Sequence, residues 1–206
     1  MGPLLIAGVL VKSSDLERLK AIGVRDSKLL TPAQRLILAT KIEEIALKVA
    51  YVEIQPKEID AYVLNSKKFF KLNYLEAKAM AKVIEELRPD IAYVDASDIS
   101  AERFGRQIES FLPLPVRVIS EHKADRKYVV VGAASILAKT RRDRALNDLT
   151  RIYGEMGNGY PHDPLTLNFL RKWLREHNDY PDFVRKSWET ARRIKEEVLR
   201  RQTELA

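Results

Sequence analysis

Short, almost wholly apolar runs recur along the chain, and longer segments with helix signals separate them. The first run is LLIAGVLV at residues 4–11, and three more follow at residues 49–54, 91–95 and 116–120. Runs of this length that are rich in β-branched residues are typical of buried strands. Two early strands, then the order strand, helix, strand, helix, predict an α/β domain with a parallel pair near the centre of its sheet.

Helix start signals lie between these runs and after the last of them. Thr31-Pro32 is a capping residue followed by a first-turn proline, and Asp163-Pro164 repeats this arrangement. Residues 57–87 are expected to form two helices. These signals predict helices before and after strands in the sequence, which is the order of elements that an α/β fold requires.

One long helix is expected to follow the last strand and to end near Tyr153. With 206 residues, the chain is long enough to bury a good-sized core. We expect residues 1–155 to form the α/β domain. Residues 156–206 are expected to form a helical C-terminal extension that packs on it.

Charge and cysteine content limit the partners and the compartment. The chain has 36 Lys and Arg against 29 Asp and Glu, a net charge of +7, and residues 115–150 hold eight basic and four acidic side chains. This balance favours an acidic partner such as nucleic acid, although basic surfaces also serve solubility. No cysteine occurs, which excludes disulfides and thiolate metal sites and favours a cytoplasmic protein. No apolar run approaches the ~18 residues of a membrane span, so no membrane partner is expected.

Two aspartates follow neighbouring apolar runs. Asp95 ends IAYVD, and Asp125 lies just beyond VRVIS in a basic cluster with Lys123, Arg126 and Lys127. Parallel strands bring their carboxyl ends to one edge of a sheet, where open α/β sheets place their sites. Two carboxylates there could share a divalent cation while the basic side chains hold phosphates. A single aspartate is more often a cap or a turn former, but the pair favours a metal site for phosphodiester hydrolysis.

Three further features could contact nucleic acid. Ser27-Lys28 offers a hydroxyl and an ammonium to a phosphate, Tyr160 is an aromatic ring in a tight turn, and Lys139 begins a basic helical face. Each also has an ordinary structural interpretation. Ser27-Lys28 could be a solvated loop, Tyr160 could be packed under its turn, and Lys139 could simply be solvated.

Six blocks of the sequence keep a familiar order and cover nearly the whole chain. They are IAGVLV, GVRDSKLLTPAQR, IAYVDASD, EHKADRKYVVVGAASILAKTRRDR, GNGYPHDP and PDFVRKSWET. Together they resemble ribonuclease HII, the type 2 ribonuclease H, and most of all its archaeal branch. The HKAD block and the GYPxDP turn are the specific parts. The resemblance implies a ribonuclease H-like α/β fold, with a mixed sheet flanked by helices and a helical C-terminal extension.

The same resemblance implies a metal-dependent endonuclease with a role in DNA replication and repair. Its substrates would be RNA/DNA hybrids and DNA duplexes that contain ribonucleotides, and its site would hold two magnesium or manganese ions. Asp95 and Asp125 match catalytic, metal-binding aspartates of the family, and Tyr160 matches the tyrosine that reads the ribose. Lys28 and Lys123 match positions near the nucleic-acid backbone.

One element of the family pattern does not occur in the 206 residues. The family opens with a strand that carries DEAGRG and lies between the second and fourth strands. It supplies two more acids, for four in all, and a loop that grips the ribonucleotide. Neither DE nor GRG occurs in this sequence. We therefore expect the natural protein to extend upstream of Met1. Without that strand, the flanking strands should close up, swap between chains or leave a groove, and the chain should bind metal poorly and have little activity.

Three other interpretations stay open. Asp95 with Glu121-His122-Lys123 gives the Asp…Glu-x-Lys arrangement of restriction-type nucleases, in which the acids bind metal and the lysine supports the attacking water. The chain could also be a non-catalytic module that binds RNA/DNA hybrids, or a plain α/β domain whose basic excess has no partner. Replacing Glu121 should abolish activity in the first case, whereas replacing Asp125 should do so in a ribonuclease H.

Overall fold

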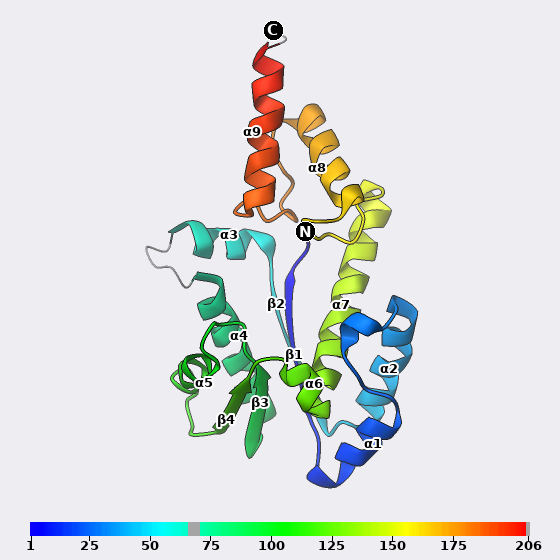
Figure 1. Cartoon of the computed structure of the whole chain (residues 1–206), viewed down its shortest axis with the longest axis vertical. Coiled ribbons are helices and arrows are strands. Elements are labelled where there is room, and N and C mark those ends of the chain that lie inside the picture. Colours follow the sequence, from blue (N-terminus) through cyan, green and yellow to red (C-terminus); the bar gives the residue numbers. More distant parts are fainter. Residues whose placement is uncertain (66–70, 205–206) are drawn as a thin grey trace. The chain divides into compact units, whose positions relative to one another are not determined.

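The structure is a computed structural model, and it describes residues 1–65 and 71–204. This part of the chain contains four strands, which lie where the apolar runs predicted them (Figure 1). They are β1 (Leu4–Leu10), β2 (Lys48–Ile54), β3 (Ile91–Asp95) and β4 (Arg117–Glu121).

The strands form two two-stranded sheets within the described residues. β1 pairs with β2, and β3 pairs with β4. The second pair is parallel, with Ile91 opposite Arg117 and Asp95 opposite Glu121, so the predicted parallel pair is confirmed. The sheet expected from the sequence is therefore divided, because β1 and β3 are not hydrogen-bonded to each other.

The chain consists of two compact units. Unit 1 contains residues 1–4, 54–68 and 142–206, and unit 2 contains residues 5–53 and 69–141. The boundary that the sequence suggested after residue 155 stays a prediction.

One core of unit 2 gathers around β1 and β2. It includes the helices α1 (Leu16–Ala21) and α2 (Pro32–Ile45). Thr31 caps α2, because its hydroxyl accepts from the N–H of Gln34 while the Gln34 side chain accepts from the N–H of Thr31. The predicted helix start is thus confirmed. The largest fully buried side chains of this core are Leu19, Ile42, Ile136 and Leu137.

A second core of unit 2 lies against β3 and β4. Figure 1 shows α4 (Lys71–Leu87) and α5 (Ala101–Glu109) beside this sheet. Ser100 starts α5 by accepting from the N–H of Arg103. Phe104 and Ile108 of α5 are fully buried in this core.

The long helix expected after β4 is interrupted. It consists of α6 (Ala124–Lys127) and α7 (Val129–Tyr153), separated by Tyr128, whose φ of −116° and ψ of 116° are extended. The ring of Tyr128 lies 4.5 Å from that of Tyr93, and its hydroxyl donates to Glu121. These contacts to β3 and β4 hold the backbone out of the helical region. The predicted end of the long helix near Tyr153 is confirmed, whereas the break at Tyr128 was not predicted, because local sequence preference does not include such tertiary contacts.

Unit 1 is mostly helical in its described residues. Its helices are α3 (Pro56–Asn65), α8 (Pro164–His177) and α9 (Glu189–Glu204), together with the end of α7. Asp163 caps α8 by accepting from the N–H of Thr166, as the Asp163-Pro164 signal predicted. None of the helices in the described ranges is long and apolar enough to cross a membrane. The core of unit 1 includes Met156, Leu170, Leu174 and Ile194.

Candidate active site

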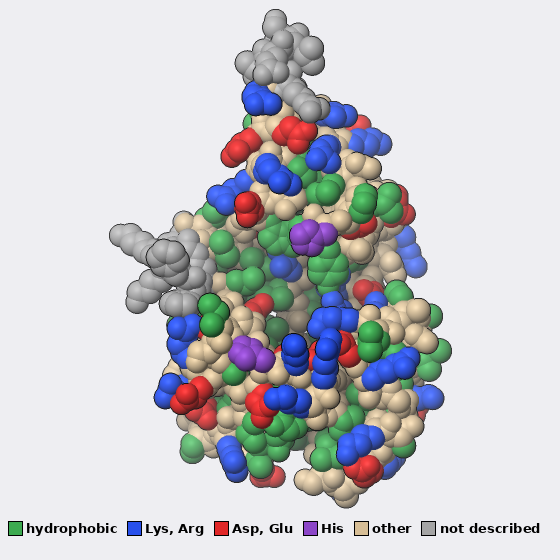
Figure 2. All heavy atoms as spheres, in the orientation of Figure 1, with side chains coloured by type: hydrophobic (Ala, Val, Ile, Leu, Met, Phe, Trp, Pro, Cys, Tyr) green, Lys and Arg blue, Asp and Glu red, His purple; other side chains and the backbone are tan. Residues whose placement is uncertain are grey.

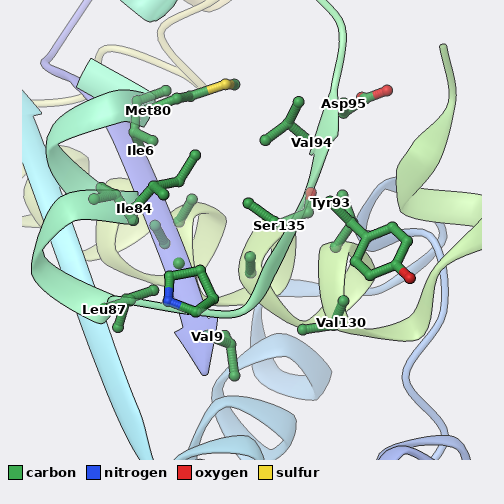
Figure 3. A pocket seen from close by; sticks show the side chains of 18 of the residues that line it. Ile6, Val9, Met80, Ile84, Leu87, Tyr93, Val94, Asp95, Val130 and Ser135 are labelled. Carbon is green, nitrogen blue, oxygen red and sulfur yellow. The ribbon is translucent and has the colours of Figure 1, made fainter. Parts of the chain in front are cut away.

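Asp95 and Asp125 line one cavity in unit 2, with a volume of about 260 Å³. Asp95 is the last residue of β3 (Figure 3), and Asp125 lies in α6. The Asp95 Oδ1 accepts a hydrogen bond of 3.0 Å from the N–H of Ala124, the residue before Asp125. The end of β3 is thus tied to the start of α6. Both acids lie where open α/β sheets place their sites, beyond the carboxyl ends of parallel strands.

A left-handed turn brings Asp125 to this position. Lys123, between β4 and α6, has a φ of 57° and a ψ of 35°, a conformation that costs an L-residue about 1–2 kcal/mol. The Asp125 side chain is 5% exposed, and its Oδ2 lies 3.6 Å from the Nζ of Lys28. A buried carboxylate is stabilised by such an opposite charge. Lys28 and Asp125, which sequence reasoning selected separately, therefore lie together.

Asp26 and Arg126 form a pair that sequence reasoning missed. The buried Asp26 carboxylate accepts from the N–H of Lys28 at 3.0 Å and from the Nε of Arg126 at 2.9 Å. The N–H of Lys28 and, despite burial, the Arg126 guanidinium hold the pKa of Asp26 below its usual value. The pair ties the 3-10 turn η2 (Ser27–Leu29), which carries Lys28, to the helix that carries Asp125. The sequence signal was an aspartate two residues before Lys28, typical of an Asx turn, and it indicated no partner.

Ser27 points into the interior of unit 2. It is 1% exposed, and its hydroxyl oxygen lies 2.9 Å from that of Ser135 on α7. This position suits packing between η2 and α7. A phosphate contact by Ser27 stays a prediction, and it would require the turn to rearrange.

Tyr160 belongs to unit 1, whereas the cavity belongs to unit 2. The guanidinium of Arg142 lies 4.1 Å from the centre of its half-exposed ring, and Arg142 also donates to the carbonyl of Asn158. Asp163 accepts from the N–H of Asn158 and from the hydroxyl of Thr166. The ring is therefore held on a turn with many internal bonds.

Basic side chains surround α6. Figure 2 shows Lys and Arg side chains gathered on the face of unit 2 where Figure 1 labels this helix. Lys28 and Arg126 are more than half exposed, and Lys127 pairs with Glu121. Lys139 is half-buried on α7. Exposed cations beside two carboxylates suit a phosphate that is bound next to a metal ion.

Glu121 is bonded away from the two aspartates. It accepts from Lys127 and from the hydroxyl of Tyr128 at 2.6 Å, and these bonds lower the pKa of Glu121. In the described part of the chain, the cavity is lined by Asp95 and Asp125 but not by Glu121. The geometry therefore favours the two aspartates over the Asp…Glu-x-Lys arrangement.

Two aspartates suit a magnesium ion, which takes one or two carboxylates and otherwise binds water and phosphate oxygens. No group of three or more His, Cys, Asp or Glu side chains that could hold a metal ion occurs within residues 1–65 and 71–204. The site thus offers a metal ion a partial set of ligands, which water and a phosphate would complete.

Solved structures place the chain in a known class. It is 41% identical to ribonuclease H2 from Pyrococcus horikoshii, with a TM-score of 0.87 over 97% of this chain and 92% of that one. The structure of the PCNA:RNase HII complex from Archaeoglobus fulgidus is 36% identical in sequence. It matches with a TM-score of 0.84 over 94% of this chain and 90% of that one. Bst-RNase HIII in complex with Mn²⁺ is 18% identical with a TM-score of 0.76 and so supports the fold alone. The fold is that of the ribonuclease H-like α/β proteins, as predicted.

The sequence comparisons narrow this class to one family. Residues 1–191 match the model of the family described as Ribonuclease HII. Ribonuclease HII of Thermococcus sibiricus is 42% identical over 96% of this chain and 87% of its own length. Ribonuclease HII of Pyrococcus furiosus is 41% identical over 100% of this chain and 90% of its own length. The chain belongs to the ribonuclease HII family, which makes it a hydrolase of the ribonuclease H type.

Proposed function

We propose that the protein is an endonuclease that cleaves the RNA of RNA/DNA hybrids and cuts duplex DNA at embedded ribonucleotides, in replication and repair. The observation that carries this proposal is that Asp95 and Asp125 line one cavity beside the ammonium of Lys28. Membership of the ribonuclease HII family supports the reaction class. The cysteine-free composition supports a cytoplasmic location.

The proposed cofactors are two magnesium or manganese ions, of which Asp95 and Asp125 would hold at least one. A bound ion would polarise the scissile phosphate and lower the pKa of a bound water. Bst-RNase HIII, a protein of the same fold, has been solved in complex with Mn²⁺. The two aspartates would orient such an ion, because each is fixed to its own element of unit 2.

The basic side chains would bind the nucleic-acid backbone. Lys28 and Lys123 would contact phosphates near the two aspartates, and Lys28 would exchange its ion pair with Asp125 for a phosphate. Lys139 would add a contact from α7, and Tyr160 would read the ribose. Ser27 would contribute through packing unless the η2 turn opens.

We further propose that this chain is a weak catalyst unless more acids join the site. The resemblance implies four acids, whereas the described residues bring together two. Each carboxylate adds charge that offsets the cost of removing water from the ion. Two carboxylates offset less of this cost than four, so metal binding should be weak.

The test is cleavage of an end-labelled DNA duplex that holds one ribonucleotide, first in magnesium and then in manganese. Cleavage at the ribonucleotide, lost in D95N and D125N but kept in D90N, would support the proposal. Asp90 is an exposed aspartate just before β3 and serves as the matched control. If the chain does not cleave, an added strand carrying an Asp-Glu pair should restore activity.

Two results would contradict this function. Loss of cleavage in E121Q, with D125N active, would favour the Asp…Glu-x-Lys nuclease. Tight hybrid binding with no cleavage, even after the Asp-Glu strand is added, would favour a non-catalytic binding module.

A further inference from the structure

We propose that Arg35 is a positioning residue for Lys28, and that its guanidinium holds the η2 turn in the shape that presents the Lys28 ammonium to a phosphate. The inference rests on the proposed function, in which Lys28 contacts the nucleic-acid backbone. It gives a role to an arginine of α2 that sequence patterns did not indicate. The contacts that carry it all lie within unit 2.

The backbone of η2 closes the turn weakly at its end. The N–H of Leu29 donates to the carbonyl of Asp26 at 3.0 Å. The next bond, from the N–H of Leu30 to the carbonyl of Ser27, is 3.4 Å long. Hydrogen bonds of this kind usually measure about 2.7–3.2 Å. The end of the turn, just after Lys28, is therefore held loosely by its own backbone.

Arg35 strengthens this end of the turn. Its Nη1 donates to the carbonyl of Leu30 at 2.6 Å and to the carbonyl of Ser27 at 3.2 Å. One nitrogen thus bridges the two residues whose own bond is long. Hydrogen bonds from a charged donor are stronger than those between neutral groups. The two carbonyls lie on either side of Lys28 in the chain, so the bridge fixes the direction in which that side chain leaves the turn.

Arg35 itself lies on a well-fixed helix. It is near the start of α2, where Thr31 and Gln34 form reciprocal capping bonds. Further along the helix, Leu38 and Ile42 are buried in the core around β1 and β2. The guanidinium therefore ties the η2 turn to a packed helix.

The position of the Lys28 ammonium decides what it can bind. Its Nζ lies 3.6 Å from the Asp125 Oδ2, and the side chain is 65% exposed. A long, exposed side chain loses conformational entropy when it is ordered on a ligand. A turn of fixed shape limits this loss and keeps the ammonium beside the two aspartates. Without the Arg35 bridge, Lys28 should lose most of its contribution to phosphate binding.

Two other contacts hold the start of the turn. The carboxylate of Asp26 accepts from Arg126, and the hydroxyl of Ser27 lies 2.9 Å from that of Ser135. These contacts remain when Arg35 is replaced. The turn should then stay attached to unit 2 while its end loosens, so a variant at this position should still fold.

The test measures how salt affects binding of the whole protein to a fluorescein-labelled RNA/DNA hybrid, followed by anisotropy. Divalent metal is left out, so cleavage does not contribute. Each phosphate contact adds about 0.9 to the slope of log K against log salt concentration for duplex DNA. K28M should therefore reduce the slope by about one, and R35M should do the same. R18M is the matched control and should keep the slope, since Arg18 is 63% exposed and pairs with Asp15.

The double variant of K28M with R35M separates positioning from a direct contact. If Arg35 acts through Lys28, adding K28M to R35M should reduce the slope no further. A further reduction of about one would mean that Arg35 contacts a phosphate of its own, and it would overturn the proposal. R35Q is the second variant, because its shorter side chain also gives up the bridge but stays polar. It should reproduce the result of R35M, and it decides the question if R35M is too unstable to measure.

Two further outcomes would also count against the proposal. A slope in R35M and R35Q equal to that of R18M, with a reduced slope in K28M, would overturn the positioning role and leave the proposed function intact. A slope that K28M leaves unchanged would contradict the phosphate contact of Lys28 in the proposed function, and the role of Arg35 would fail with it.

Discussion

Two aspartates in the two units have opposite surroundings. In unit 1, Asp163 accepts hydrogen bonds from the N–H of Asn158 and from both the N–H and the hydroxyl of Thr166. In unit 2, the more buried Asp125 forms an ion pair of 3.6 Å with the exposed ammonium of Lys28. A carboxylate whose oxygens accept hydrogen bonds from residues of its own turn stabilises that turn. An acid that faces a long, exposed lysine can exchange that partner for a ligand.

The largest effect should come from removing the Asp125 charge. D125N should lower the affinity for Mn²⁺ by about tenfold or more, because the site has few other ligands. D163N should leave the affinity for Mn²⁺ unchanged. Electron paramagnetic resonance of free Mn²⁺ measures both affinities. Equal affinities in the two variants would remove the distinction between the two aspartates.

The next effect concerns the turn that Asp163 holds. A Cβ at Gly157 would lie 1.8 Å from the Asp163 Oδ2, whereas a Cβ at Gly154 would meet nothing within 4 Å. Both glycines have positive φ, so each alanine variant costs about 1–2 kcal/mol of backbone strain. G157A should cost about 1–3 kcal/mol more because of overpacking. Chemical denaturation measures the difference, and equal unfolding free energies would show that the turn yields to the extra methyl group.

A smaller effect is expected from the cation over the Tyr160 ring. R142M keeps much of the apolar stem but removes the guanidinium, which lies 4.1 Å from the ring centre and also donates to the carbonyl of Asn158. The free energy of unfolding should fall by about 0.5–1 kcal/mol. R151M is the control, since Arg151 is 81% exposed and pairs with Asp148 one turn away. A similar loss in both variants would mean that the ring contact contributes nothing specific.

The smallest effect is the dependence of stability on pH. Hydrogen bonds from the N–H of Asn158 and then from Thr166 hold the pKa of Asp163 below its usual value of 3.8. This carboxyl therefore contributes its full stabilisation above about pH 4, and the contribution is lost as the pH falls through its lowered native pKa. Thermal melts between pH 2 and 5 should show a shallower acid slope in D163N. Parallel slopes in the two proteins would contradict the assignment.

The sequence predicted those features that depend on neighbouring residues. Apolar runs gave the four strands, and Thr31 and Asp163 marked helix starts that the structure has. Features that depend on distant partners were missed. The extended Tyr128 requires Tyr93 and Glu121, and the pair of Asp26 with Arg126 joins residues 100 positions apart. Spacing along one chain carries no signal for such contacts.

The candidate site follows the same division. The carboxyl ends of the two predicted strands indicated that Asp95 and Asp125 lie near each other, and both line one cavity, while their catalytic role stays a prediction. The inward direction of Ser27 could not be predicted, because a serine in a loop before a helix is usually solvated. Its burial depends on Ser135, which lies on a helix far along the chain.

Tyr128, the extended residue between α6 and α7, also makes the orientation of Asp125 independent of insertions in α7. In a continuous helix, inserting one residue would rotate everything before it by roughly 100° relative to everything after it. Tyr128 breaks that rotational coupling, since the orientation of Asp125 is set by β3 and by Asp26 and not by the phase of α7. Insertions near the far end of α7 can therefore accumulate over evolution without turning the carboxylate away from its cavity.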